Sequence, residues 1–246
     1  MCPHPIIRIA FFFFLFPVLA MTQSDSPKIL VFSKTAGFRH ASIEDGQQAL
    51  FKLGKEMAIA VDTTEDGRLF NPQQLKNYDA VVFLNTTGDV LNEVQEDAFE
   101  SYIQSGGAYM GIHAATDTEY DWPWYGKLAG AYFDGHPGGP NVREGQVTVV
   151  DHKHPSTQNL PKTWIKKDEF YDFKAYNEAV HVLITVDESS YDWDKMGDFH
   201  PLSWYHEYDG GRAFYTNFGH TKASFTEPKM LEHLKGGLRY LLQSQK

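Results

Sequence analysis

Nearly continuous apolar runs alternate with amphipathic segments through the first half of the chain. Residues 28–33 and 79–84 are apolar runs bounded by polar or turn-forming residues, which is typical of buried strands. Residues 43–56 and 92–104 carry apolar side chains at helical spacing. Strands that are apolar on both faces and alternate with helices predict a parallel sheet covered on both sides.

Weaker signals complete this half of the chain. Ser42 and Asn92 stand where side chains cap the two helices. Residues 58–61 form a second, short strand in this interpretation, and residues 72–76 one helical turn.

Residues 106–117 form the segment around which the predicted fold is organised. Two glycines end the second helix, a short apolar run follows, and Gly111-Ile112-His113-Ala114-Ala115 is typical of a sharp turn from a strand into a helix. Nucleophile elbows have this pattern, with serine or cysteine at the tip, whereas here the tip is His113. The alternative is a buried core histidine beside a glycine turn.

The second half predicts one continuing domain with loop and hairpin insertions. The hairpin turns at Asp209-Gly210-Gly211, a strong turn signal. The other expected elements are a short helix at 122–130, strands at 146–150 and 182–186, hairpin strands at 201–208 and 212–217, and a closing helix at 227–242.

The expected topology places three polar loops at one edge of the sheet. Loops 34–40, 85–89 and 113–117 each follow a predicted strand, and ligands of open α/β sheets bind beyond the carboxyl ends of the strands. His40, His113 and His220 are therefore expected to meet in one pocket.

The N-terminus predicts export. Arg8 precedes an apolar run at 9–20 that ends in Val18-Leu19-Ala20, which is typical of a cleaved secretory signal over residues 1–20. Residues 21–27 would be a linker and 28–243 the folded domain. We expect a periplasmic or secreted protein with no stable membrane insertion after cleavage; the alternative is an uncleaved anchor.

Composition excludes several classes of function. The only cysteine is Cys2, inside the expected signal, so the mature protein would have no disulfide, zinc thiolate or cysteine nucleophile. The formal net charge is −10 without a basic cluster in the sequence, so we expect no nucleic-acid partner. Eighteen Phe, thirteen Tyr and five Trp suit a sugar-binding surface as well as a core, and Tyr171 and Trp204 are candidate substrate contacts.

Eleven histidines are the main candidates for chemistry, because imidazole transfers protons near neutral pH and binds metals. No pair has the spacing of a helical zinc motif, so the sequence leaves a divalent metal open. Phosphate-binding glycine motifs are missing, so no nucleotide is expected. Histidines in loops or at strand ends are His40, His113, His136, His200, His206 and His220; surface or strand positions are expected for His152, His154, His181 and His233.

Two adjacent carboxylates stand beside aromatic residues at Asp168-Glu169-Phe170-Tyr171. A carboxyl group against aromatic rings can have a raised pKa and donate a proton. The alternative is an exposed charged turn. The aspartates at 187, 192, 194 and 198 suggest a calcium loop only faintly, because their spacing is wrong for an EF-hand.

Several segments, in order, resemble the ThuA-like (trehalose utilisation) family: residues 37–43, 111–117, 125–133, 154–155, 168–171 and 211–220. The resemblance implies a flavodoxin-like, class I glutamine amidotransferase-like fold and a role in sugar use. Amidotransferases carry a cysteine at the elbow and a histidine after a late strand. Here His113 and His220 take these places, and Lys222 stands where an orienting carboxylate would be. Glutaminase activity is therefore excluded.

The expected function is acid–base chemistry on a sugar or keto-glycoside: isomerisation, elimination or hydration. His113 and His220 are the candidate base and acid, Asp117 could orient one of them, and Glu169 is an alternative acid. Candidate contacts to substrate hydroxyls are Arg39, His40 and His136. Two alternatives stay open: a non-catalytic carbohydrate-binding protein, and a glycoside hydrolase using Glu169 and Asp117 as paired carboxylates. The expected partner is a small carbohydrate, and a homo-oligomer is compatible with the sequence.

Overall fold

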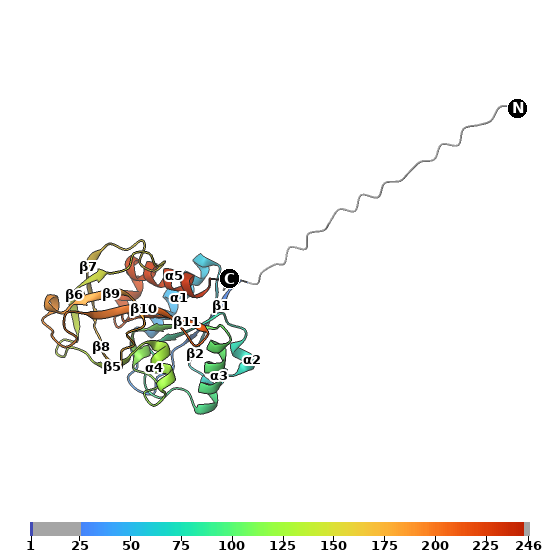
Figure 1. Ribbon diagram of the computed structural model, residues 1–246, viewed down its shortest axis with the longest axis horizontal. Helices are drawn as coiled ribbons and strands as arrows, with labels where there is room; N and C mark the ends of the chain where they lie inside the picture. The colour runs from blue at the N-terminus through green and yellow to red at the C-terminus, as the bar shows by residue number, and fades with distance from the viewer. Residues whose placement is uncertain (2–25, 244–246) are drawn as a thin grey trace.

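Helices pack on both sides of a central sheet in the computed structural model, which describes Met1 and residues 26–243 (Figure 1). The sheet order is β2-β1-β3-β4-β11-β10-β9-β6-β7. Its parallel half contains β1 (Lys28–Phe32), β2 (Ala60–Thr64), β3 (Ala80–Leu84), β4 (Ala108–Ile112) and β11 (Gly211–Thr216). Its antiparallel half adds β10 (His200–Tyr208), β9 (His181–Asp187), β6 (Val142–Val149) and β7 (Thr163–Glu169). The expected α/β class is confirmed, whereas the expected signal and linker lie outside the described residues, apart from Met1 and residues 26–27.

The parallel strands are buried on both faces, as their apolar runs predict. In β1, Ile29 and Val31 belong to one core, and Leu30 and Phe32 to the other, because successive side chains of a strand point to opposite faces. All five residues of β3 are fully buried. The sheet therefore separates two apolar cores.

Each core is closed by its own helices (Figure 1). The first contains side chains of α1 (Ile43–Met57) and α5 (Pro228–Leu241). The second contains side chains of α3 (Glu93–Gln104), α4 (Pro123–Ala129) and the short α2 (Pro72–Leu75). The 3-10 turns are η1 (Gly67–Leu69), η2 (His113–Thr116), η3 (Glu188–Tyr191) and η4 (Lys222–Thr226).

The two expected helix caps have different outcomes. Asn92 is confirmed: its side chain accepts from the Gln95 amide, and the Gln95 side chain accepts from the Asn92 amide, which forms a capping box. Ser42 is the N-cap residue of α1, as expected, but its side chain makes no capping hydrogen bond to the helix. Its hydroxyl donates instead to the carbonyl of Gly219, 2.8 Å away, in the loop after β11.

The antiparallel half is larger than the sequence indicated. The hairpin at Asp209-Gly210 is confirmed as β10 and β11. Strand β7 was missed, as was a separate pair made of β5 (Tyr132–Gly135) and β8 (Asp172–Lys174). Strand β7 escapes recognition because the buried face of its C-terminal half carries Lys166 and Asp168, a pattern that resembles a charged turn.

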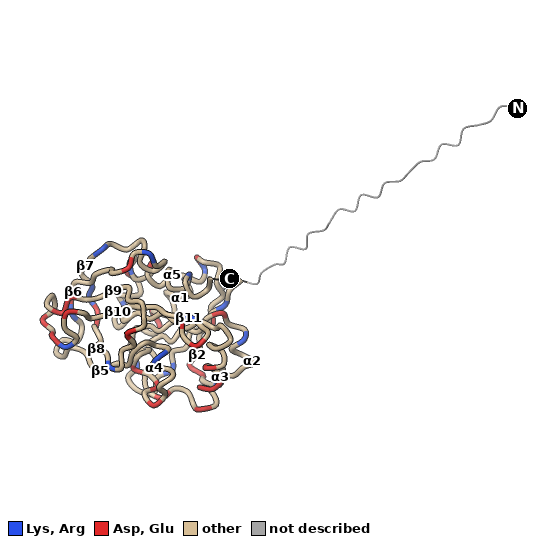
Figure 2. The backbone as a smooth tube through the Cα atoms, in the orientation of Figure 1, with Lys and Arg blue, Asp and Glu red and all other residues tan. Residues whose placement is uncertain are grey.

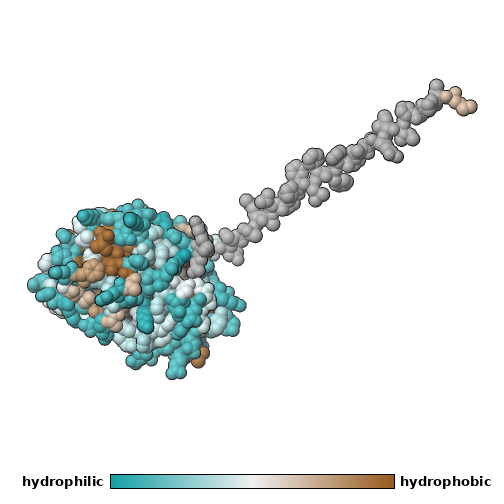
Figure 3. Space-filling view, in the orientation of Figure 1, coloured by the Kyte–Doolittle hydropathy of each residue, from teal (hydrophilic) through white to brown (hydrophobic). Residues whose placement is uncertain are grey.

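The surface is mixed in charge and locally apolar. Asp and Glu gather around α3 in Figure 2, and Lys and Arg are dispersed. Figure 3 shows apolar residues gathered over the antiparallel half of the sheet, the half whose end carries the exposed Ile165 and Val150. Among the described residues, no helix has the length and apolarity needed to cross a membrane.

A buried glutamate ties together the loops that follow β3 and β4. Glu119 is 3% exposed, and its Oε1 accepts hydrogen bonds from the amides of Val90 and Leu91 at 2.9 and 2.8 Å. Burial raises the pKa of Glu119 to about 7, against the opposing effect of the two amides, and Asp89 and Glu96 raise it further.

This pKa predicts a measurable pH effect on stability. The folded pKa lies above the unfolded value of 4.5, so the stability that protonated Glu119 contributes is present below pH 4.5 and is lost as pH rises through 7. The unfolding free energy of the wild type should fall by about 1–2 kcal/mol between pH 5 and pH 8, a figure reduced to allow for solvent screening. Glu119→Gln carries no titrating group at this position and should not show this fall. Urea unfolding of both proteins at the two pH values tests this, and equal pH dependence would contradict it.

Candidate functional site

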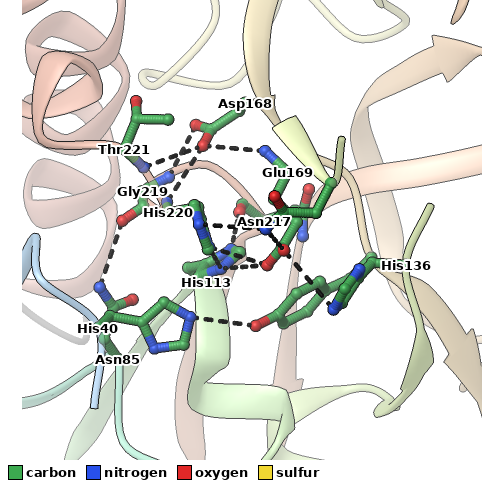
Figure 4. Close-up of polar contacts among 12 residues, drawn as sticks. His40, Asn85, His113, His136, Asp168, Glu169, Asn217, Gly219, His220 and Thr221 are labelled. Atoms are coloured by element: carbon green, nitrogen blue, oxygen red, sulfur yellow. Dashed lines mark hydrogen bonds and ion pairs between the residues drawn. The ribbon is translucent and has the colours of Figure 1, made fainter. Parts of the chain in front are cut away.

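Three histidine rings from three different strand ends meet at the carboxyl edge of the parallel sheet (Figure 4). His40 lies in the loop after β1, His113 directly follows β4, and His220 lies in the loop after β11. The ring centroids of His40 lie 4.9 Å from His113 and 5.1 Å from His220, and those of His113 and His220 lie 5.3 Å apart. The expected meeting of the three histidines is therefore confirmed as geometry.

His113 occupies the sharp turn that the sequence indicated. Its backbone has a φ of 49°, a left-handed conformation that is uncommon for residues other than glycine. Its side chain is fully buried, and the ring Nδ1 lies 2.7 Å from the backbone carbonyl of Asn217. Because a carbonyl only accepts, Nδ1 of His113 donates to it, and Nε2 faces the cluster.

Glu169 lies between the histidines, at the end of β7. Its Oε2 is 2.8 Å from Nδ1 of His220 and 3.3 Å from Nε2 of His113. Its Oε1 is 3.6 Å from Nε2 of His136 and accepts a hydrogen bond from the side-chain amide of Asn141. Burial raises the pKa of Glu169, but hydrogen bonds from His113 and His220 outweigh it and hold the pKa well below its usual range. The carboxyl group is therefore ionised.

Asp168 holds the backbone that carries His220. Its Oδ1 accepts from the amides of His220 and Thr221 at 3.1 and 3.3 Å, and its Oδ2 accepts from the amide of Gly219 at 3.0 Å. Its side chain is fully buried, and Nζ of Lys166 lies 3.3 Å away. The alternative of an exposed charged turn at Asp168-Glu169 is therefore wrong, because both carboxylates are buried.

The peptide of Gly219 is held from the other side as well. Its carbonyl accepts from the Ser42 hydroxyl at 2.8 Å and from the side-chain amide of Asn85 at 3.2 Å. Gly219 has a φ of 127°, which side chains other than hydrogen rarely permit. Residues after β1 and β3 and within β7 therefore hold the backbone of Gly219 in the loop after β11 and, with it, the position of His220.

His40 and Tyr171 close one side of the cluster. Burial lowers the pKa of His40 to about 2, and the neighbouring His113 and His220 lower it further, so its ring is neutral. Its Nε2 lies 3.4 Å from the Tyr171 hydroxyl, and its Nδ1 is buried without a hydrogen-bond partner among the described residues. The Tyr171 ring lies 4.2 Å from the ring of His113, and burial raises the pKa of its hydroxyl well above 10.

The other candidate residues have varied positions. His136 borders the cluster through Glu169, and its Nδ1 lies 2.9 Å from the Pro137 carbonyl. Asp117 accepts from the Tyr120 hydroxyl at 2.6 Å; burial raises its pKa. The structure orients His113 through Asn217 and His220 through Glu169, whereas Asp117 was the expected orienting residue.

Two expected substrate contacts have partners outside the cluster. Trp204 is fully buried in the second core, where its indole donates to the Ala129 carbonyl, 2.9 Å away. Arg39 is half-exposed and pairs with Glu44 and Glu65 at 2.8 and 2.9 Å. The burial of Trp204 corrects the expectation that it faces a substrate, whereas the role of Arg39 stays a prediction.

Sequence reasoning missed the residues that support the cluster. They are Asn141 and Asn217, which contact Glu169 and His113, and Ser42 and Asn85, which donate to the Gly219 carbonyl. Asp168 was a candidate carboxylate, but its role in holding the backbone of Gly219 and His220 was not expected. Asn85 and Asn217 each stand directly after a buried strand, and that position was the available signal. Asn141 follows a glycine-rich loop and gave none.

Most remaining histidines serve packing. The surface or strand positions expected for His154 and His233 are wrong, because the residues are 5% and 1% exposed and lie in a loop and in α5. His200 lies between Glu188 Oε1 and the Tyr171 carbonyl, both at 2.8 Å. In the faint calcium pattern, Asp187 instead caps η3 through the Ser189 amide.

Comparison with known proteins agrees with this architecture. A family model described as trehalose utilisation, ThuA, matches residues 28–241. A ThuA-like protein of Bacteroides uniformis superposes with a TM-score of 0.75 at 24% identity, covering 91% of this chain and 95% of that one. One from Parabacteroides merdae gives 0.70 at 20% identity, covering 90% and 92%.

A more distant match lies within a larger enzyme. A β-galactosidase of Bacillus circulans sp. alkalophilus superposes with a TM-score of 0.57 at 10% identity, covering 88% of this chain but only 31% of that one, so the likeness concerns the fold alone. The search of curated proteins gave no match. Because the family model spans the whole described sheet and its helices, the chain belongs to the ThuA (trehalose utilisation) family.

Proposed function

We propose that the chain is a secreted enzyme that moves protons on a sugar or keto-glycoside, in an isomerisation, elimination or hydration. One observation carries the proposal: an ionised carboxylate and three imidazoles converge at the edge of the sheet where open α/β folds bind ligands. Membership in a family described by trehalose utilisation indicates a carbohydrate-related role.

The cluster has the groups that such a reaction needs. Removing a proton from a carbon beside a carbonyl requires a base and a group that stabilises negative charge on the carbonyl oxygen. His113 and His220 are the proposed pair, and Glu169, 3.3 and 2.8 Å from their ring nitrogens, fixes both rings. His136 is 36% exposed at its side chain and can reach a substrate hydroxyl.

The test is a panel of glycosides and their 3-keto forms, with products identified by mass spectrometry. In deuterated water, a substrate that turns over should gain deuterium at the carbon next to the carbonyl, because the base exchanges its proton with solvent. Binding of a panel sugar without turnover or deuterium uptake would overturn the proposal and favour the carbohydrate-binding alternative.

A glycoside hydrolase is the second candidate, and one observation favours it. Burial raises the pKa of Asp117, while the neighbouring histidines lower that of Glu169. Opposite shifts in two carboxyl groups are typical of a general acid and its ionised partner. Release of the aglycone from unoxidised glycosides, lost in Asp117→Asn, would select this candidate over proton transfer on keto-sugars.

A further inference from the structure

Three atoms of the cluster that could bind a metal lie within 3.3 Å of one another. Nε2 of His113 lies 3.3 Å from Nδ1 of His220, and the two lie 3.3 and 2.8 Å from the same oxygen, Oε2 of Glu169. Around a tetrahedral ion with bonds of about 2.0 Å, ligand atoms are separated by about 3.3 Å. The triangle therefore has the dimensions of one face of a metal coordination sphere.

His40 adds a fourth ligand. One ligand atom from each of His40, His113, Glu169 and His220 lies within 4.8 Å of all the others. The His40 side chain is almost completely buried, and its Nδ1 has no hydrogen-bond partner in the part of the chain that is described. A buried polar atom without a partner is costly unless it meets a ligand, which is an observation independent of the triangle.

We propose that His40, His113, Glu169 and His220 bind one divalent transition-metal ion. Three imidazole nitrogens and one carboxylate oxygen suit Zn²⁺ and its neighbours in the first row, whereas Mg²⁺ and Ca²⁺ prefer oxygen alone. Zn²⁺ is the expected occupant of a four-ligand set of this kind.

The second layer of contacts is that of a metal site. Metal-binding histidines usually donate their other ring N–H to a carbonyl or carboxylate, and Nδ1 of His113 meets the Asn217 carbonyl in this way. Oε1 of Glu169, the oxygen outside the triangle, accepts from the side-chain amide of Asn141, and Asp168 accepts from the backbone amide of His220. Each of these three ligands is thus oriented by a group outside the cluster.

A second group of similar composition shows the contrast. Asp172, Glu188 and His200 are also close together and buried. There, however, the Glu188 oxygens accept from the amides of Lys195, Met196 and Gly197, and the His200 nitrogens contact Glu188 and the Tyr171 carbonyl. Glu188 and His200 therefore already have partners, whereas Asp172 Oδ2 has no hydrogen-bond partner among the described residues and lies 3.9 Å from Nζ of Lys195. Because two of these three side chains are already engaged, we expect one tightly bound ion in the described part of the chain.

Metal binding does not depend on the proposed function, but the role of the ion in catalysis does. A bound ion would polarise a sugar carbonyl, and His113 and His220 would then act as its ligands. Proton transfer would pass to a group beside the ion, for which His136 and Asp117 are the candidates. Binding itself needs no substrate, so it is measured separately from turnover.

The experiment uses the chain without its first 20 residues, stripped with chelator and titrated with Zn²⁺ and Co²⁺ by calorimetry. We expect about one ion per chain and a visible Co²⁺ spectrum of a nitrogen-rich site. His113→Ala and His220→Ala should each weaken binding by at least about 100-fold. The exposed His152→Ala is the matched control and should bind normally.

The outcomes separate the two proposals. Circular dichroism of the stripped variants shows whether they fold, and Glu169→Gln, which keeps the shape of the side chain, provides a second variant at the same site. Absent binding in folded wild type, or equal binding by wild type and all three site variants, overturns the metal site. Tight binding in a protein that turns over no panel sugar leaves the metal site standing and overturns only the enzymatic function.

Discussion

Replacing His113 by alanine should lower kcat on the natural substrate by about 10²–10⁴-fold, and replacing His220 should do the same. The two ring nitrogens are 3.3 Å apart and face one carboxylate oxygen, so loss of either ring disables the cluster. The result is expected whether the rings transfer protons or hold an ion. Steady-state kinetics on the substrate found in the keto-glycoside panel measures the effect.

The double variant sharpens this prediction. Residues that act as a unit are strongly non-additive, so His113→Ala combined with His220→Ala should be little slower than either single variant. His152→Ala, an exposed histidine outside the cluster, should keep wild-type kcat and KM. Near-normal turnover in both single variants would show that the rings only support the fold.

The parallel half of the fold was predictable because local pattern and tertiary environment agree there. Strands buried on both faces must be apolar throughout, as β3 is, and the helices between them carry one apolar stripe. In β7, Lys166 and Asp168 are buried as partners of each other, so the strand carries charge where a period-two pattern expects apolar residues.

The candidate site was predictable only as far as topology reaches. His40, His113 and His220 follow parallel strands, whose carboxyl ends share one edge. Glu169 stands at the end of β7, which is the outermost strand of the antiparallel half, and the chain then continues through Tyr171 into β8. No local sequence signal predicts that path, so Glu169 was not predicted as the carboxylate that orients His220.

Asp168→Asn should have the largest effect on stability. The carboxylate is fully buried and accepts from the Gly219, His220 and Thr221 amides and from the Ser224 hydroxyl. An amide group turns one acceptor into a donor that faces backbone donors. It also removes a charge partner of Lys166, which is 2% exposed.

The expected loss is about 3 kcal/mol of unfolding free energy, near the low end for breaking a buried ion pair. The low end applies because Lys166 keeps Glu227, 2.9 Å away. Urea unfolding measures the loss, with Asp198→Asn on an exposed loop as the control.

Because the same amides hold His220 in place, the folded Asp168→Asn variant should also lose turnover. Combining it with Lys166→Met should restore part of the stability but not the turnover. A loss below about 1 kcal/mol, the usual size for a single hydrogen bond, would mean that water or Glu227 replaces the carboxylate and that the loop after β11 does not depend on it.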